Sequence, residues 1–402
     1  GINMESRVAI IEISNTFIRL IIGGSIDGEP VIIQKVESPI SGLISRGEVL
    51  DEQKLVSILS ELRTINDERT HLTYELNDVT LVIPPIGLEI FESEKTTNVV
   101  SPSSIIEKLD ISNVISLVQK ESIESDKVIV DVVPDYFRLE GDRYSIEPPI
   151  GDTSNSVHVH AKVHVMLRKY ADTYKRLVES AGMRVRRICV SPYAISTYAR
   201  EQGVNKDYIL VDMGAQITNI TLVGNHAPIA TTHILIGGND LSFAIAEKFN
   251  CSEEQANNLK EVYGRFEHTL AFKPCLLNSV NQEGENASYY PEDLDHVIEL
   301  FFRDNYFKQI DNALMTMLKD YPQEVLKLPL VVTGGFSKLR GLEKMMKERY
   351  SEQEVRFLDS DVIGARHPKY IPLVGGLMCA THYKGALSDQ RNKVNNIERV
   401  KR

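Results

Sequence analysis

The pattern of apolar and polar positions contains the same short arrangement twice. In residues 7–24 and again in residues 208–224, an apolar run ends in a polar turn and then resumes. Apolar runs of this length on both sides of a turn are typical of two paired strands. The sequence therefore predicts two β-hairpins, and their repetition indicates a duplicated architecture.

Each predicted hairpin carries an acid where its first strand ends, Glu12 in one and Asp212 in the other. Gly214 follows in the second hairpin. A glycine lets backbone amides approach a phosphate, and a carboxylate can hold the hydrated metal ion that accompanies it. A plain hairpin with a solvated acid at its tip fits the same residues, so both interpretations stay open on this pattern alone.

Three glycine pairs recur at the ends of predicted strands or the starts of predicted helices. Residues 237–238 lie between an apolar run and a helix, and such a helix N-terminus is suited to anion binding. Residues 334–335 follow a strand that ends at Thr333, where they permit close approach of backbone to a ligand. Residues 375–376 begin a helix and predict a close contact with a neighbouring element.

Other segments predict local structure. Asp51 is expected to cap a helix over residues 52–66, and the apolar spacing in 291–320 predicts one long helix. His158, His160 and His164 alternate along a predicted strand and share one face with Lys162, so that face is expected to be solvated. Because no acid or cysteine joins the histidines there, no metal site is expected.

Composition and charge restrict the function. The 402 residues have the balance of a soluble globular protein with two to four domains, and the formal net charge of −11 argues against a polyanion as a general partner. The four cysteines follow no zinc or disulfide spacing, which favours a reducing, cytosolic compartment. No apolar run is long enough for a membrane span. Residues 1–3, before Met4, look like a remnant of expression.

The ordered series of these features resembles the superfamily of actin, sugar kinases and heat-shock ATPases. Within it, the chain is similar over residues 7–383 to the FtsA family of actin-like bacterial cell-division proteins. The segments that carry this likeness occupy residues 41–51, 79–87, 128–136, 149–151, 256–264 and 331–337.

The resemblance implies an α/β fold with two actin-like, ribonuclease H-like lobes around a nucleotide cleft and an inserted FtsA-type subdomain. The implied divisions are the lobe one core at 1–86, 165–199 and 375–385, the inserted subdomain at 87–164, the lobe two core at 200–238 and 328–374, an outer subdomain of lobe two at 239–327, and a disordered linker at 386–402.

The resemblance also implies the site residues of an ATP and Mg²⁺ cleft. Glu12 and Asp212 hold the water molecules of the metal ion and are the catalytic candidates. The phosphates are held by Ser14, Asn15, Thr16 and Arg19 and by the backbone of Gly214, Ala215 and Gln216. The adenosine side comprises Gly238, Asn239, Asn257, Lys260, Gly334, Gly335 and Ser337.

The chain departs from the family pattern mainly on the phosphate side. The first phosphate loop of the family reads Asp-x-Gly-Ser-Ser, whereas Glu12 and Ser14 stand here at the acid and the glycine. Ala215 and Gln216 replace glycines of many relatives, and Asn257 stands where a glutamate is frequent. A side chain in place of a glycine hinders the approach of backbone to phosphate. At most a weak ATPase is therefore expected.

The family likeness implies an adaptor that forms filaments on the cytoplasmic face of the plasma membrane at the division septum. The expected partners are the C-terminal peptide of FtsZ, which docks on residues 239–327, other copies of the chain, and later division proteins. The family attaches to the membrane through a C-terminal amphipathic helix. Residues 392–402 have too little apolar surface to be that helix.

Two other functions on the same fold remain open. One is a small-molecule kinase, although no motif supplies its catalytic aspartate between the lobes. The other is an adaptor without ATPase activity, such as the pilus-assembly protein PilM. An FtsA-type adaptor binds the FtsZ tail, whereas a PilM-type adaptor binds a short N-terminal peptide of a pilus protein.

Overall fold

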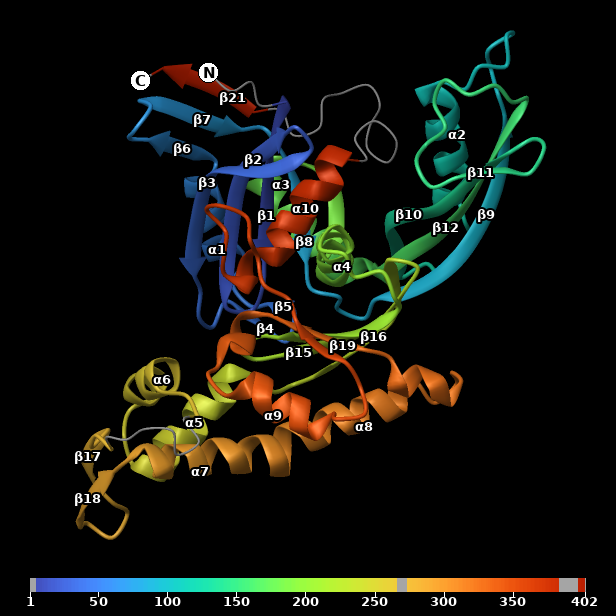
Figure 1. Cartoon of the computed structure of the whole chain (residues 1–402). Helices are drawn as coiled ribbons and strands as arrows, with labels where there is room; N and C mark the ends of the chain where they lie inside the picture. Colours follow the sequence, from blue (N-terminus) through green and yellow to red (C-terminus); the bar gives the residue numbers. More distant parts are fainter. Residues whose placement is uncertain (1–4, 266–272, 383–396, 402) are drawn as a thin grey trace.

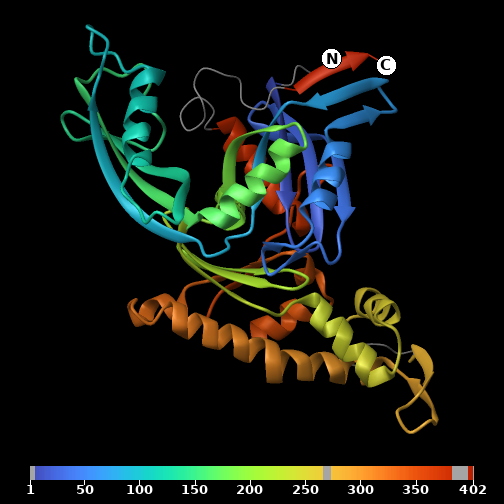
Figure 2. The same cartoon turned by 180° about the vertical axis from the view of Figure 1, so that it is seen from behind.

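The computed structural model describes residues 5–265, 273–382 and 397–401. Its strands form two five-stranded sheets in separate lobes, and a four-stranded sheet extends to one side of the first lobe (Figure 1, and from behind in Figure 2). Each of these sheets is packed into its own hydrophobic core. The predicted α/β, two-lobe architecture is therefore confirmed.

The sheet of lobe one has the strand order β13-β8-β1-β2-β3. Strands β1 to β3 are antiparallel neighbours, and β8 and β13 add in parallel to β1. Its strands are β1 (Glu5–Ile13), β2 (Phe17–Ile26), β3 (Glu29–Pro39), β8 (Asp78–Ile83) and β13 (Arg184–Val190). Its helices are α1 (Glu52–Leu62), α3 (Arg168–Ser180), α4 (Ser191–Glu201) and α10 (Ile371–His382). Asp51 caps α1 as predicted, because its carboxylate accepts a hydrogen bond from the Lys54 amide.

Lobe two repeats this plan with the strand order β16-β15-β14-β19-β20. The strands are β14 (Tyr208–Met213), β15 (Thr218–Gly224), β16 (Ala227–Ile234), β19 (Leu330–Thr333) and β20 (Val355–Phe357). Both predicted hairpins are thus confirmed, as β1–β2 and β14–β15. In the first hairpin Glu12 lies opposite Arg19, and in the second Asp212 lies opposite Asn219.

The outer part of lobe two is mainly helical. It contains α5 (Gly238–Phe249), α6 (Glu253–Val262), the hairpin β17 (Leu277–Val280) and β18 (Asn286–Tyr289), α7 (Pro291–Phe301) and α8 (Phe307–Met317). The helices η2 (Gln323–Lys327), η3 (Gly335–Lys338), α9 (Leu342–Arg349) and η4 (Pro368–Tyr370) follow. The prediction of one helix over 291–320 is wrong in detail, since the π-helical segment η1 (Phe302–Tyr306) separates α7 from α8 and places Phe302 and Tyr306 in the core.

The four-stranded side sheet, with the order β11-β10-β12-β9, has the helix α2 on one face (Figure 1). Its elements are β9 (Glu89–Asn98), α2 (Lys108–Gln119), β10 (Lys127–Leu139), β11 (Arg143–Ser145) and β12 (Ser156–Leu167). These bounds overlap the segment 87–164 that the sequence assigns to an inserted subdomain. We call this unit the side subdomain.

The prediction that the histidine face of β12 is solvated is wrong for its inner half. His164 is fully buried against Tyr193, and the Lys162 ammonium is buried between Asp135 and the Gly224 carbonyl. The face packs against lobe two and α4, which alternation within one strand cannot reveal. The expectation that no acid joins the histidines is also wrong. Glu92 and Glu94 on β9 and Asp135 on β10 lie beside His158 and His160.

Two small sheets complete lobe one. The hairpin β4 (Ile44–Ser45) and β5 (Glu48–Val49) borders the cleft, and β6 (Thr64–Asp67), β7 (Leu72–Leu76) and β21 (Ile397–Lys401) form the other sheet. The prediction of a disordered linker is wrong for residues 397–401, which pair antiparallel with β7 as strand β21. Without β21, β7 would be an edge strand with unpaired backbone groups, and a short extended segment can pair with such an edge. Residues 386–396 of that linker lie outside the described residues.

The chain passes between the lobes at α4 and again at α10, and these two helices are in direct contact (Figure 1). A Cβ atom on Gly375 of α10 would overlap the Ala194 carbonyl of α4. The predicted close contact at the glycine pair 375–376 is therefore confirmed, and it brings the two backbones together.

Candidate functional site

A cavity of about 880 Å³ lies where the turns of the two hairpins face each other between the lobes. Of the site residues predicted from the sequence, all except Ser337 line it: Glu12, Ser14, Asn15, Thr16, Arg19, Asp212, Gly214, Ala215, Gln216, Gly238, Asn239, Asn257, Lys260, Gly334 and Gly335. The volume falls within the usual range for small-molecule and cofactor sites.

The acids of the two hairpins both lie at this cavity, Glu12 buried and Asp212 half-buried. Burial, opposed by Arg19 and assisted by the Asp212 and Glu37 charges, raises the pKa of Glu12 to about 8. Burial likewise raises the pKa of Asp212 to about 6, again opposed by Arg19. The Glu12 Oε1 atom is buried and has no hydrogen-bond partner. Since an unpaired buried carboxylate is costly, this acid pair is suited to a cation.

Arg19 is held on the lobe one side of the cavity by several groups. Its guanidinium lies over the Phe17 ring, 3.3 Å from the centroid, and donates a hydrogen bond to the Lys369 carbonyl at 3.2 Å. The Nε atom lies 3.5 Å from Glu37, which also forms an ion pair with Lys369 at 3.2 Å. Arg19 is thus a positive charge fixed in position beside the acids.

Asn15 supports the first hairpin turn from within. Its side-chain oxygen accepts a hydrogen bond from the Gly47 amide at 3.1 Å, and the Gly47 carbonyl accepts one from the Tyr174 hydroxyl at 2.9 Å. Gly47 has a φ of +84°. Asn15 therefore links the turn to the β4–β5 hairpin, which the sequence pattern did not indicate.

The second hairpin turn is packed against the start of α5. The Gly214 amide donates to the Ile217 carbonyl at 3.0 Å, while the Gly214 and Ala215 carbonyls accept from the amides of Gly238 and Asn239 at 3.0 and 2.8 Å. A Cβ on Gly237 would overlap the backbone of Gly214 and Ala215. The Gly214 amide is thus engaged within the turn, although the residue lines the cavity as predicted.

The opposite wall of the cavity contains a buried lysine and an aromatic ring. The Lys260 ammonium donates to the Gly238 carbonyl at 2.9 Å and lies 5.8 Å from the centroid of the Phe336 ring. Burial lowers the pKa of Lys260. Asn257 accepts a hydrogen bond from Ser242.

Ser337 corrects the predicted site. Its hydroxyl is buried and donates to the Gly334 carbonyl at 2.6 Å, so it closes the turn after β19 and does not face the cavity. Gly334 itself has a φ of +98° and approaches Asp212 so closely that a Cβ would lie 2.7 Å from the carboxylate oxygen. A turn residue two positions after a glycine pair can point either way, and the sequence does not decide between them.

The structure adds cavity residues that the sequence analysis missed, including Phe17, Glu37, Gly47, Phe336 and Lys369. Phe17 and Phe336 adjoin predicted site residues and could have been found from that position. Glu37 reaches the cavity from β3 and Lys369 from η4, and no local signal marks either residue.

Comparison with known proteins agrees with this geometry. The sequence model of the family described as "Cell division protein FtsA" matches residues 209–375. The chain is 24% identical to Cell division protein FtsA of Bacillus subtilis, with 93% of this chain and 83% of the relative covered. It is 23% identical to Cell division protein FtsA of Enterococcus hirae, with 90% and 80% covered.

Solved structures share the fold at low sequence identity. A structure titled "PilM-PilN type IV pilus biogenesis complex" has a TM-score of 0.60 at 16% identity and covers 95% of this chain and 99% of its own. MreB5 of Spiroplasma citri, in a structure bound to ADP, has a TM-score of 0.53 at 10% identity and covers 92% and 96%.

The two sheets and the paired hairpins form an actin-like fold, which the chain shares with MreB5. The chain is similar in sequence to FtsA proteins over more than nine-tenths of its length. Among residues 5–265, 273–382 and 397–401, no helix has both the length and the apolar character to cross a membrane.

Proposed function

We propose that the chain is an FtsA-type, actin-like adaptor of bacterial cell division that binds ATP with Mg²⁺ in the cavity between the hairpins. The observation that carries the proposal is the meeting of Glu12 and Asp212, with Arg19 beside them, at the mouth of two duplicated hairpins. The kinship with FtsA over most of the chain supports the division role.

The residues divide into roles by their chemistry. Glu12 and Asp212 would hold the metal ion through water, and the metal would supply charge neutralisation for the phosphates. Arg19 fixes a positive charge on the lobe one side, and the hairpin turns of Asn15 and Gly214 border the phosphate region. Lys260 and Phe336 form the wall for the nucleoside.

Hydrolysis is expected to be slow or absent. Ser14 stands at the family glycine, and the Gly214 amide donates within its own turn. Fewer backbone amides are therefore presented to phosphate than in a glycine-rich loop. Nucleotide would act as a binding ligand that holds the lobes together.

Calorimetric titration with a non-hydrolysable ATP analogue in Mg²⁺ tests the nucleotide role. We expect micromolar or tighter binding that Asp212→Ala weakens at least tenfold, and that Lys260→Met also weakens. Lys347→Met is a matched control, because Lys347 forms an exposed ion pair with Glu343 away from the cavity. Equal affinity in Asp212→Ala and the unchanged chain would refute the assignment of the acid.

The proposed partners are the C-terminal peptide of FtsZ, other copies of the chain in a filament, and later division proteins. We place the peptide on the outer part of lobe two, where Phe243 and Val262 are more than half exposed on α5 and α6. An acidic-to-hydrophobic peptide needs such an apolar surface. The location would be the cytoplasmic face of the plasma membrane at the septum.

Peptide binding separates this role from that of a pilus adaptor. We expect the FtsZ C-terminal peptide to bind and Phe243→Ala to weaken it severalfold. Met315→Ala serves as the control, since Met315 is similarly exposed on α8. Binding of a pilus-protein N-terminal peptide in place of the FtsZ peptide would assign the chain to a PilM-type adaptor and overturn the proposal.

A further inference from the structure

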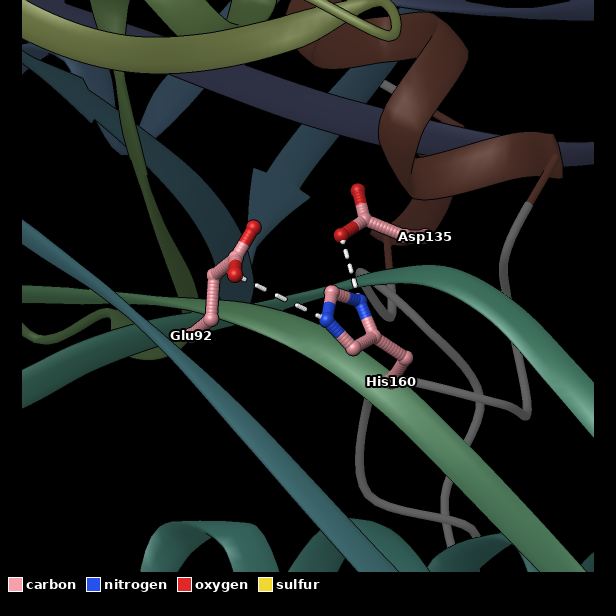
Figure 3. Close-up of side chains that lie close together, drawn as sticks. All are labelled: Glu92, Asp135 and His160. Carbon is pink, nitrogen blue, oxygen red and sulfur yellow. Dashed lines mark hydrogen bonds and ion pairs between the residues drawn. The ribbon is translucent and has the colours of Figure 1, made fainter.

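A histidine is held between two carboxylates on the side subdomain, outside the nucleotide cavity (Figure 3). His160 of β12 places Nδ1 2.9 Å from an oxygen of Asp135 on β10. Its Nε2 atom lies 3.8 Å from an oxygen of Glu92 on β9. Three adjacent strands thus converge on one imidazole.

The imidazole is fixed in position by buried groups. The Asp135 carboxylate is buried, and its second oxygen accepts a hydrogen bond from the Lys162 ammonium at 2.8 Å. The Tyr136 ring stacks on His160, with centroids 5.1 Å apart and planes within 2°. A carboxylate at Nδ1 favours the tautomer that carries its proton there, so the lone pair of Nε2 points toward Glu92.

The charges around Nε2 favour a cation. Glu92 is exposed and free to adjust, and Glu94 lies directly opposite His160 in the strand register. The nearby Lys162 ammonium is engaged by Asp135 and by the Gly224 carbonyl. The Glu92 carboxylate therefore faces Nε2, the Glu94 carboxylate pairs with the neighbouring His158, and Asp135 and Lys162 balance each other.

We propose that His160 Nε2 and the Glu92 carboxylate bind a divalent transition-metal ion of the Zn²⁺ type, with water completing the coordination. Imidazole and carboxylate are common ligands of this ion, and a carboxylate that holds the other ring nitrogen of the ligand histidine is a recurrent supporting group. Asp135 is then a positioning residue. The ion would join β9 to β12 beside the contact of Lys162 with lobe two.

Titration of the full chain with Zn²⁺, in the absence of nucleotide, tests the site. We expect saturable binding of one ion and a loss of at least tenfold in affinity for His160→Gln and for Glu92→Gln. His158→Gln is the matched control, since His158 occupies the same face two residues away with Thr96 and Glu94 as partners. Unchanged affinity in His160→Gln, or no saturable binding, would overturn the proposal.

Co²⁺ substitution distinguishes this site from binding to a thiol such as the exposed Cys275. Visible absorption of bound Co²⁺ without a thiolate charge-transfer band, and its disappearance in His160→Gln, is the expected result. A thiolate band that Cys275→Ser removes would show that the ion binds elsewhere, against the proposal.

The positioning role of Asp135 needs a paired variant. Asp135→Asn alone would leave the buried Lys162 ammonium without its carboxylate, so it is combined with Lys162→Met. We expect this double variant to bind Zn²⁺ more weakly and to shift the visible absorption of bound Co²⁺, because His160 Nδ1 no longer has the carboxylate that holds the ring in place. Unchanged affinity together with an unchanged Co²⁺ spectrum would remove Asp135 from the site.

Discussion

Glu12 and Asp212 come from different lobes, yet they lie near enough across the cavity that the Asp212 charge raises the pKa of Glu12. Each stands near the end of the first strand of its hairpin, so the duplicated fold brings together two acids that are remote in sequence. Because two negative charges close together repel each other, it is costly to ionise both carboxylates. A cation between them would offset that cost.

The acid pair predicts that the protein loses stability as pH rises. Folding raises the pKa of Glu12 from 4.5 to about 8 and that of Asp212 from 3.8 to about 6. Between these values the folded state keeps protons that the unfolded state has released, so the free energy of unfolding falls with increasing pH. The Glu12 contribution is on the order of 4 kcal/mol. Urea titrations at pH 5 and pH 8.5 measure it.

Glu12→Gln is the control for this pH dependence. It should flatten the fall in unfolding free energy between pH 5 and pH 8.5, whereas Glu343→Gln on the surface should leave it as it is. Mg²⁺ should stabilise the unchanged chain more at pH 8.5 than at pH 5, and chelation should reverse the gain. A wild-type slope in Glu12→Gln would show that another group causes the fall.

The two glycines after β19 predict very unequal effects of the same substitution. Gly334 has a φ of +98°, and a Cβ there would meet Met213 and the Asp212 carboxylate, whereas nothing lies within 4 Å of a Cβ on Gly335. Gly334→Ala should therefore lower the unfolding free energy by about 1–3 kcal/mol and weaken nucleotide binding. Gly335→Ala should change the stability by much less. Denaturant midpoints that match in the two variants would contradict this reading.

The junction of the side subdomain with lobe one depends on a buried ion pair. Asp131 of β10 accepts hydrogen bonds from two nitrogens of Arg187 on β13, at 3.1 and 3.0 Å. Arg187→Met should cost about 3–5 kcal/mol, because it leaves a buried charge unpaired. Arg187→Met combined with Asp131→Leu should recover most of that loss in denaturant unfolding. A double variant as unstable as the single one would mean that packing, not charge, sets the cost.

The pairing of β21 with β7 predicts local protection from hydrogen exchange. Deletion of residues 397–402 removes the backbone partners of Leu72–Leu76. The β7 amides that face β21 should then exchange faster, while those that face β6 keep their rates. Mass spectrometry of the peptides over 64–76 measures both. Equal exchange before and after the deletion would show that β7 does not need this partner.

Local sequence patterns predicted the parts of the fold that local forces decide. The apolar runs around Glu12 and Asp212 gave both hairpins, and the side chain of Asp51 gave the start of α1. The predicted site residues gather at one cavity because the acids and glycines among them directly follow strand ends.

Contacts between distant segments account for what the sequence did not predict. Lys162 and His164 are buried by α4 and lobe two, although their own strand alternates like a half-solvated one. Ser337 turns inward to the Gly334 carbonyl, and Glu37 arrives at Arg19 from another strand. Each of these contacts depends on a residue outside the local pattern. The apolar periodicity of a single strand or helix carries no information about such contacts.

The contact of Gly375 with Ala194 has a mechanical consequence. Both passages of the chain between the lobes run through α4 and α10, and these helices touch there without an intervening side chain. Helices in backbone contact resist separation but can rotate against each other. This contact therefore acts as a pivot for the angle between the lobes. A small rotation of α4 against α10 there would produce a larger displacement at the far ends of α8 and the side subdomain.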